Sequence, residues 1–193
     1  MTSVLVTGGG ERLTEVAEAV RATGAETTVV DTLDRLGEAV SGKSFDAYVQ
    51  LPVAMTPRSG SLVGRVEQFL SEGLLSRFRA AETVLPALHD ASTVVLVGGQ
   101  TNVDTEAPDD QEARTALMRV LAHALRAERA PGHLRVRTAG PEWTGADIAA
   151  SLDGSTPSET PSTTSAQAAD RQAIGKAYAD WRAEVLGLVR VEF

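Results

Sequence analysis

Short runs of aliphatic and β-branched residues alternate with longer segments of helical periodicity along most of this chain. The first run, Val4-Leu5-Val6, ends in three consecutive glycines, and apolar residues then recur from Leu13 to Val20 at helical spacing. This order predicts a strand, a tight turn and a helix. The repeated alternation predicts βαβ units and a parallel sheet. Further strands are expected at residues 27–30, 48–51, 93–97 and 134–138, and further helices at 33–40, 62–89 and 112–129.

Composition narrows the class of protein. The 193 residues suit a single domain, residues 1–193, that folds without disulfides, and the absence of cysteine excludes thiolate chemistry. The net charge is -8 and the basic residues are scattered among acids, which argues against nucleic-acid binding. The opening residues lack the basic start of a signal peptide, and no apolar stretch approaches the ~20 residues of a membrane span. We therefore expect a cytoplasmic protein with no nucleic-acid or membrane partner.

The segment 151–165 is rich in serine, threonine and proline and has no apolar residue after Leu152. Such a composition cannot pack a core and predicts a flexible loop within the domain. A helix at about 168–186 and a final strand at 188–191 are expected to follow it.

Three stretches, in this order, resemble the short-chain dehydrogenase/reductase (SDR) family. They are VLVTGGG from Val4, RAAETVLPALHDASTVVLVGG from Arg79 and RVLAHALRAERAPGHLRVRTAGP from Arg119. The resemblance covers roughly residues 1 to 145 and implies an α/β, Rossmann-like three-layer sandwich with a mostly parallel sheet. Only about a dozen residues separate Asp31 from the strand near Ala47, too few for the usual intervening helix, strand and helix. We therefore expect a sheet shortened relative to standard SDR folds.

The residues that SDR enzymes use for hydride transfer are missing. Alignment with the family puts Gln111 at the position of the catalytic tyrosine, Thr115 at that of the lysine, Gly99 at that of the serine and Gly73 near that of the asparagine. Neither tyrosine of the chain is followed four places later by lysine. Because glutamine does not titrate and threonine carries no charge, proton transfer in the family's manner is not expected.

The glycine turn at Gly8, Gly9 and Gly10 is the first candidate for cofactor binding, because amides at a helix N-terminus attract phosphate. The family pattern would place two later glycines at Arg12 and Thr14, where side chains would obstruct a dinucleotide. Arg12 could instead bind a different anion. We therefore expect no cofactor, with NAD(P) as the less favoured alternative.

Two further positions bear on the cofactor. Asp31 closes the second strand, where an acidic residue would hold the adenosine ribose, but we favour its capping the helix that begins near Thr32. The family's cofactor-lining Asn-Asn-Ala-Gly corresponds here to the bulkier Gln50-Leu51-Pro52-Val53. This substitution also favours loss of the cofactor.

Other candidates are weaker. Asp109 and Asp110 could supply a general base, although capping of the next helix explains them better. Trp143 is the best candidate for a pocket wall, together with Gln50 and Gly99. The three histidines lack metal-ligand spacing, so no metal is expected.

The segment 62–89 carries apolar residues on an unusually wide face, which predicts burial on two sides. We therefore expect a homo-oligomer, or a heteromer with an SDR homologue, formed through helices 62–89 and 112–129. The first hypothesis is a non-catalytic structural or regulatory subunit. A repurposed cyclase, isomerase or dehydratase of a biosynthetic pathway, a ligand-sensing regulator and an NAD(P)-dependent reductase are the alternatives.

Overall fold

The computed structural model describes residues 2–53, 61–98, 108–129, 132–140 and 142–153. The chain divides into two units, Met1–Thr156 and Pro157–Phe193, and every described residue belongs to the first. Most of the segment 151–165, and the helix and strand expected after it, lie outside the described residues.

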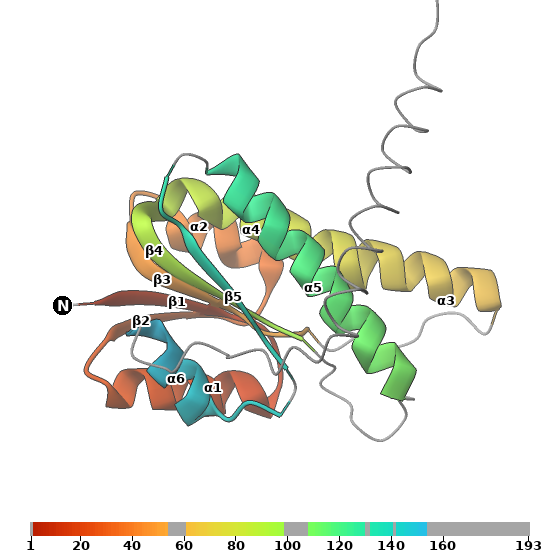
Figure 1. The fold of residues 1–193 in the computed structure, drawn as a ribbon, viewed down its shortest axis with the longest axis horizontal. Coiled ribbons are helices and arrows are strands. Elements are labelled where there is room, and N and C mark those ends of the chain that lie inside the picture. Colours follow the sequence, from red (N-terminus) through yellow and green to blue (C-terminus); the bar gives the residue numbers. More distant parts are fainter. Residues whose placement is uncertain (1, 54–60, 99–107, 130–131, 141, 154–193) are drawn as a thin grey trace, which may run out of the picture. The chain divides into compact units, whose positions relative to one another are not determined.

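Five parallel strands form one sheet in the order β2-β1-β3-β4-β5, as Figure 1 shows. The five strands expected within the described residues are confirmed to within a few residues, except that β4 begins earlier than expected. The strands are β1 (Ser3–Thr7), β2 (Glu26–Val30), β3 (Phe45–Gln50), β4 (Leu88–Val97) and β5 (Arg135–Ala139).

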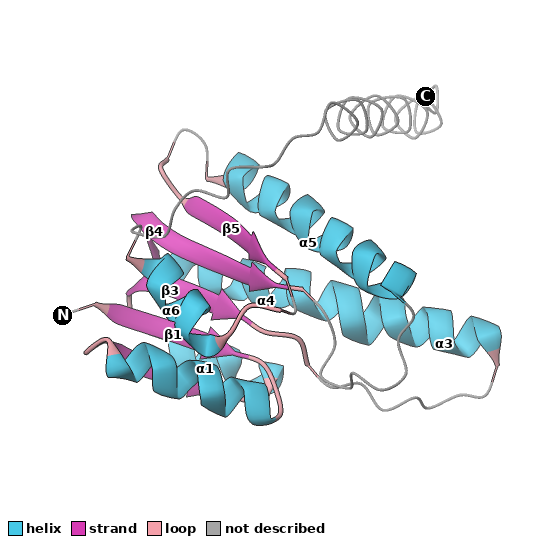
Figure 2. Ribbon diagram, turned by 60° about the horizontal axis from the view of Figure 1, so that its bottom comes forward, coloured by secondary structure: helices cyan, strands magenta, loops and turns pink. Residues whose placement is uncertain are grey.

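Helices cover both faces of this sheet and make a three-layer α/β/α sandwich (Figures 1 and 2). Helices α1 and α6 pack on one face, and α2, α4 and α5 pack on the other. The helical elements are α1 (Glu11–Ala22), η1 (Leu33–Arg35), α2 (Leu36–Val40), α3 (Leu62–Gln68), η2 (Phe69–Leu75), α4 (Ser76–Val84), η3 (Leu85–Ala87), α5 (Pro108–Glu128) and α6 (Gly145–Leu152).

The two apolar clusters follow from the alternation of side chains along each strand. Leu5 and Val94 face the α2, α4 and α5 side, whereas Val4 and Val95 face the α1 and α6 side. All four side chains are fully buried. Strands buried on both faces read as continuous apolar runs, which is why they were recognisable in the sequence.

The sheet is shortened at one edge, as expected. The chain passes from β2 through η1 and α2 directly to β3, which pairs with β1 on the side opposite β2. Strand β2 is therefore an edge strand. The Rossmann-like, shortened α/β fold is thus confirmed.

The expected long helix at 62–89 is a rod built from α3, η2, α4 and η3. Gly73 lies inside η2, a π-helical stretch. Within it the Ser71 hydroxyl donates to the Glu67 carbonyl, and directly after it the Ser76 hydroxyl donates to the Glu72 carbonyl. The rod ends at Ala87 rather than His89. Pro86 lacks an amide hydrogen and sits in the final 3-10 turn, after which β4 starts at Leu88.

Helix α6 was not anticipated, and it includes Ser151 and Leu152, which were expected to open the flexible loop. Thr144 and Asp147 form a capping box at its start. The Thr144 hydroxyl accepts from the Asp147 amide at 3.2 Å, and the Asp147 carboxylate accepts from the Thr144 amide at 2.9 Å. Among the described residues, no helix is long and apolar enough to cross a membrane.

The hydrogen bonds from Thr144 lower the pKa of Asp147, so its contribution to stability is present above the ordinary carboxyl pKa and is lost as the pH falls through the lowered value. We expect Asp147→Asn to lower the melting temperature at neutral pH and to differ less from the parent chain as the pH falls below about 4. Thermal melts across that range measure this. Asp153→Asn, at the opposite end of α6, is the control and should show no such convergence; a pH-independent loss in Asp147→Asn would contradict the prediction.

Candidate functional site

The carboxyl ends of the parallel strands meet at one edge of the sheet, where open α/β folds bind ligands. The fold brings most of the predicted site residues to this edge. Gly8 follows β1, Asp31 follows β2, Gln50 ends β3 and Trp143 lies four residues beyond β5. Gly99, after β4, lies outside the described residues. The strand order reverses between β1 and β3, so the glycine turn stands at the topological switch point.

The glycine turn is packed tightly against the segment that follows β3. Gly8 has φ 150°, and a Cβ added there would lie 2.5 Å from the Cβ of Leu51. The Gly9 amide donates to the Pro52 carbonyl at 3.3 Å, and both Leu51 and Pro52 are buried. The chain itself therefore occupies the space directly beside Gly8 and uses the Gly9 donor.

Arg12, which replaces a glycine of the family pattern, reaches across to the end of the sheet. Its Nη2 donates to the Trp143 carbonyl at 2.7 Å. The Trp143 side chain is half-buried and packs against the apolar cluster beneath α1 and α6. Arg12 as an anion ligand and Trp143 as a pocket wall stay predictions.

The expectation that Asp31 caps the next helix is wrong. Thr32 is the N-cap residue of η1, and no side-chain cap hydrogen bond is formed there. Asp31 lines an open hollow of about 350 Å³ between β2 and α2, together with Arg35, Glu38 and Lys43. The hollow is bounded by charged groups and lies on the edge where the sheet is shortened.

The remaining candidates lie at the start of α5. Asp109 and Asp110 belong to its first turn, but their side chains, like those of Gln111 and Thr115, are outside the described part of the chain. Their roles as a general base or as helix caps stay predictions. Among the residues that the structure describes, no three histidine or carboxylate groups are placed to hold a metal ion.

A buried network that the sequence did not reveal crosses the carboxyl ends of the central strands. The Tyr48 hydroxyl lies 3.0 Å from the Thr7 hydroxyl and accepts from Gln50 Nε2 at 3.0 Å. Gln50 Nε2 also donates to the Arg77 carbonyl at 2.9 Å, and Arg77 Nε donates to Gln50 Oε1 at 3.0 Å. Arg77 Nη2 donates to the Gln50 and Val97 carbonyls at 3.1 and 2.8 Å. The network joins β1, β3, β4 and α4.

Burial dominates the electrostatics of this network. It raises the pKa of Tyr48, although the hydrogen bonds from Thr7 and Gln50 and the charge of Arg77 oppose the rise. Burial also lowers the pKa of Arg77 to about 10, against the opposing effect of Tyr48. At neutral pH the tyrosine is therefore neutral and the guanidinium is charged.

Gln50 had been singled out only as a pocket-wall residue, and Arg77 not at all. One signal was present, since position 77 lies three residues after Leu74 and four before Ala81, on the face of the rod that packs against the sheet. A charged residue on the buried face of a helix indicates that its side chain either pairs with another group of the protein or binds a ligand. Its partners could not be identified from the sequence.

Several of these residues differ from those of a standard dinucleotide site. At the glycine turn, Leu51 lies against Gly8 and the Gly9 amide donates to the Pro52 carbonyl, whereas a Cβ added at Gly10 would meet nothing within 4 Å. Arg12 stands in place of a glycine, and Gln50 is fully engaged with Tyr48 and Arg77.

Solved structures share this fold, and some of them are described as short-chain dehydrogenases. A carbonyl reductase from Pseudomonas aeruginosa PAO1 in complex with NADP has a TM-score of 0.60 at 13% identity, with 80% of this chain and 91% of that chain covered. The protein lin1944 from Listeria innocua has a TM-score of 0.58 at 16% identity, with 80% and 94% covered. BdcA from E. coli has a TM-score of 0.51 at 14% identity, with 77% and 87% covered.

No protein-family model matches the sequence, and no curated protein is significantly similar to it. At these identities the similarity establishes a shared fold. The chain therefore has the SDR fold that its three sequence stretches predicted.

We expect Gly8→Ala to destabilise the fold by about 2–4 kcal/mol, because the methyl group would collide with Leu51 and the backbone is strained for any residue with a side chain. Gly37→Ala is the matched control. Gly37 lies in α2 with nothing within 4 Å of an added Cβ, so the change should stabilise the helix by up to about 1 kcal/mol. Urea unfolding measures both, and an equal effect of the two changes would contradict the tight packing at Gly8.

Proposed function

We propose that this chain is a non-catalytic, cytoplasmic subunit with the SDR fold, which associates through the rod of residues 62–87 and helix α5. The observation that supports it most directly is the contact at the glycine turn, where Leu51 lies against Gly8 and the Gly9 amide already donates to the Pro52 carbonyl. The partner is a second copy of the chain or an active homologue of the same fold. Under this proposal the chain has kept the helical interface of the SDR family and has lost the family's chemistry.

Exposed apolar side chains are concentrated on these helices. Of the six large apolar residues that the described part of the chain exposes, four belong to η2, α3 and α5. They are Val63, Leu70, Leu75 and Val120, with exposed fractions of 66, 45, 47 and 49%. Exposed apolar residues gathered on neighbouring elements are typical of a protein interface.

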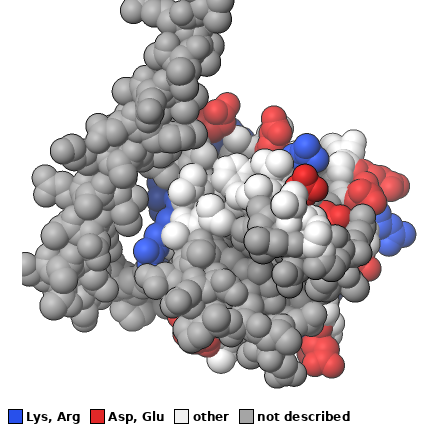
Figure 3. Space-filling model, turned by 90° about the vertical axis from the view of Figure 1, so that its right-hand side faces the viewer, with Lys and Arg blue, Asp and Glu red and all other residues white. Residues whose placement is uncertain are grey.

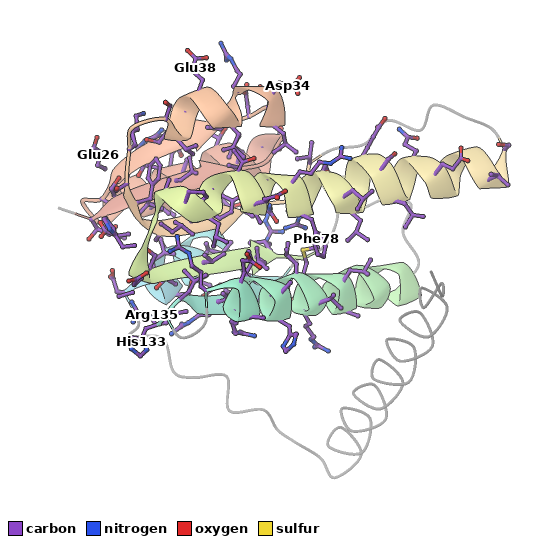
Figure 4. All side chains as sticks on the ribbon, turned by 90° about the horizontal axis from the view of Figure 1, so that it is seen from above. Glu26, Asp34, Glu38, Phe78, His133 and Arg135 are labelled. Atoms are coloured by element: carbon purple, nitrogen blue, oxygen red, sulfur yellow. The ribbon has the colours of Figure 1, made fainter. Side chains whose placement is uncertain are left out.

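Helix α5 has apolar residues on two faces. Met118, Leu121 and Leu125 are buried against the sheet and α4, and Phe78 lies between α4 and α5 (Figure 4). Val120 lies on the outer surface, along with the exposed small residues Ala116, Ala124 and Ala127. Small residues on an exposed helix face permit close packing of another helix, which supports a helical partner.

The arrangement of the elements supports the same interface. In Figures 1 and 2, α3 and the first turns of α5 extend beyond the ends of the strands, so the sheet does not cover them. On the face in Figure 3, the described acidic and basic side chains are dispersed, with uncharged surface between them. Such a surface suits a protein partner better than a polyanion.

The first test is cofactor binding. Titration of the purified chain with NADH and with NADPH, followed by calorimetry, should give no saturable binding at millimolar cofactor. The carbonyl reductase from Pseudomonas aeruginosa PAO1, which has been solved with NADP, is the positive control. A micromolar dissociation constant for this chain would contradict the proposal and favour a reductase.

The second test is association. Size-exclusion chromatography with light scattering should give at least twice the 20.3 kDa of one chain, and Leu70→Glu or Val120→Glu should return the mass to that of the monomer. A buried charge without a partner opposes association. Val29→Glu, at a similarly exposed valine on β2, is the control and should not change the mass. A chain that stays monomeric, and does not co-purify with a co-expressed SDR enzyme, would rule out this role.

A further inference from the structure

Arg77 is the one charged residue that the described part of the chain buries, with 8% of its surface exposed. It stands at the beginning of α4 and extends over the carboxyl ends of β3 and β4. Its three acceptors are the Gln50 side-chain oxygen and the carbonyls of Gln50 and Val97, at 2.8 to 3.1 Å. All three acceptors are neutral, so the positive charge is solvated by dipoles alone.

The guanidinium is also incompletely satisfied. Arginine has five N–H donors, and those on Nε and Nη2 account for the bonds to Gln50 and Val97. Among the described residues, nothing accepts from the two hydrogens of Nη1, and no carboxylate pairs with Arg77. A buried cation in this state carries a large desolvation cost, which an opposite charge would offset.

The surrounding network prevents a rearrangement that would satisfy Nη1. Both hydrogens of Gln50 Nε2 are already donated, one to the Tyr48 hydroxyl and one to the Arg77 carbonyl, so the amide orientation is fixed. Its oxygen is held by Arg77 Nε. The vacant donors therefore belong to a rigid, preorganised group, which is the condition under which a ligand loses least entropy on binding.

The Nη1 donors also lie where this type of fold usually has its ligand site. They lie at the carboxyl edge of the sheet, at the ends of β3 and β4, and β3 is next to the switch point. Open α/β folds bind small molecules at this edge. At the turn after β1, Leu51 lies against Gly8 and the Gly9 amide donates to the Pro52 carbonyl. The Nη1 donors of Arg77 therefore offer a second candidate position for a ligand at this edge, at the ends of β3 and β4.

We propose that Arg77 binds an oxyanion, the carboxylate or phosphate group of a small ligand, through Nη1 at the carboxyl ends of β3 and β4. Guanidinium pairs strongly with either group, and exclusion of water strengthens the pairing. The site goes beyond the role proposed above and does not depend on the chain's association or on its lack of dinucleotide binding.

The probes are sodium acetate and sodium phosphate, each titrated into the full chain against sodium chloride at constant ionic strength. We expect a saturable rise in melting temperature with at least one of the two, and a saturable shift of the Arg77 Nε–H resonance in arginine-labelled protein. The probe that binds more tightly distinguishes a carboxylate ligand from a phosphate ligand. Absence of saturable binding with both probes would overturn the proposal and leave Arg77 a clamp between strands.

Three variants make the test specific. Arg77→Met keeps an unbranched, flexible side chain without the guanidinium and should weaken binding about tenfold or more. Gln50→Glu puts a carboxylate where Oε1 now lies, 3.0 Å from Nε, so the protein supplies its own counter-charge and the anion response should disappear. Arg79→Met, an exposed arginine on the same helix, is the matched control and should bind as the parent chain does.

Each result has a defined meaning. Equal binding by the parent chain and Arg77→Met, or equal loss in Arg79→Met, would overturn the proposal. If Arg77→Met does not fold, Gln50→Glu decides, because an undiminished anion response in that variant would also overturn it. If NADPH binds the parent chain but not Arg77→Met, the oxyanion site stands while the non-catalytic role fails. If acetate or phosphate binds and NADPH does not, both stand.

Discussion

A continuous set of buried hydrogen bonds from Thr7 through Tyr48 and Gln50 to Arg77 fixes the carboxyl ends of the central strands relative to α4. Strand ends leave carbonyls without partners, and a buried carbonyl without a hydrogen bond is costly. One guanidinium satisfies two of them, on β3 and on β4. Because Arg77 belongs to α4, the same contacts link this helix to the ends of β3 and β4. The candidate site is therefore built on the group that joins these three elements.

The shortening of the sheet also changes the surroundings of the carboxyl end of β2. With β3 directly beside β1, β2 is left with one partner, and the hollow around Asp31 is bounded by α2 rather than by another strand. The strand has only five residues and begins with the exposed Glu26, features that discourage pairing with other chains. The hollow that results is lined by Asp31, Arg35, Glu38 and Lys43.

The sequence predicted the strands and most helices because their signals are local. Val4-Leu5-Val6 and Thr93 to Val97 are continuous apolar runs, and such runs form buried strands whatever surrounds them. The Arg77 network could not be predicted in this way, because Gln50 lies 27 residues before Arg77 and Val97 lies 20 after it. The prediction that Asp31 caps the next helix was wrong for a related reason. The sequence does not tell whether a carboxylate lies against a helix or lines an open hollow.

Packing within the protein explains Gly8 and Gly9 of the glycine turn, but it does not fully explain the buried Arg77. Gly8 is required by the contact with Leu51, and the Gly9 amide has its acceptor in Pro52, so neither needs a ligand. Arg77 is different, because a buried cation carries a desolvation cost that neutral acceptors offset only in part. The Gln50 side-chain oxygen and the strand carbonyls account for Nε and Nη2, but among the described residues nothing accepts from Nη1. The functional centre of this SDR fold is therefore better sought at the ends of β3 and β4 than at the turn after β1.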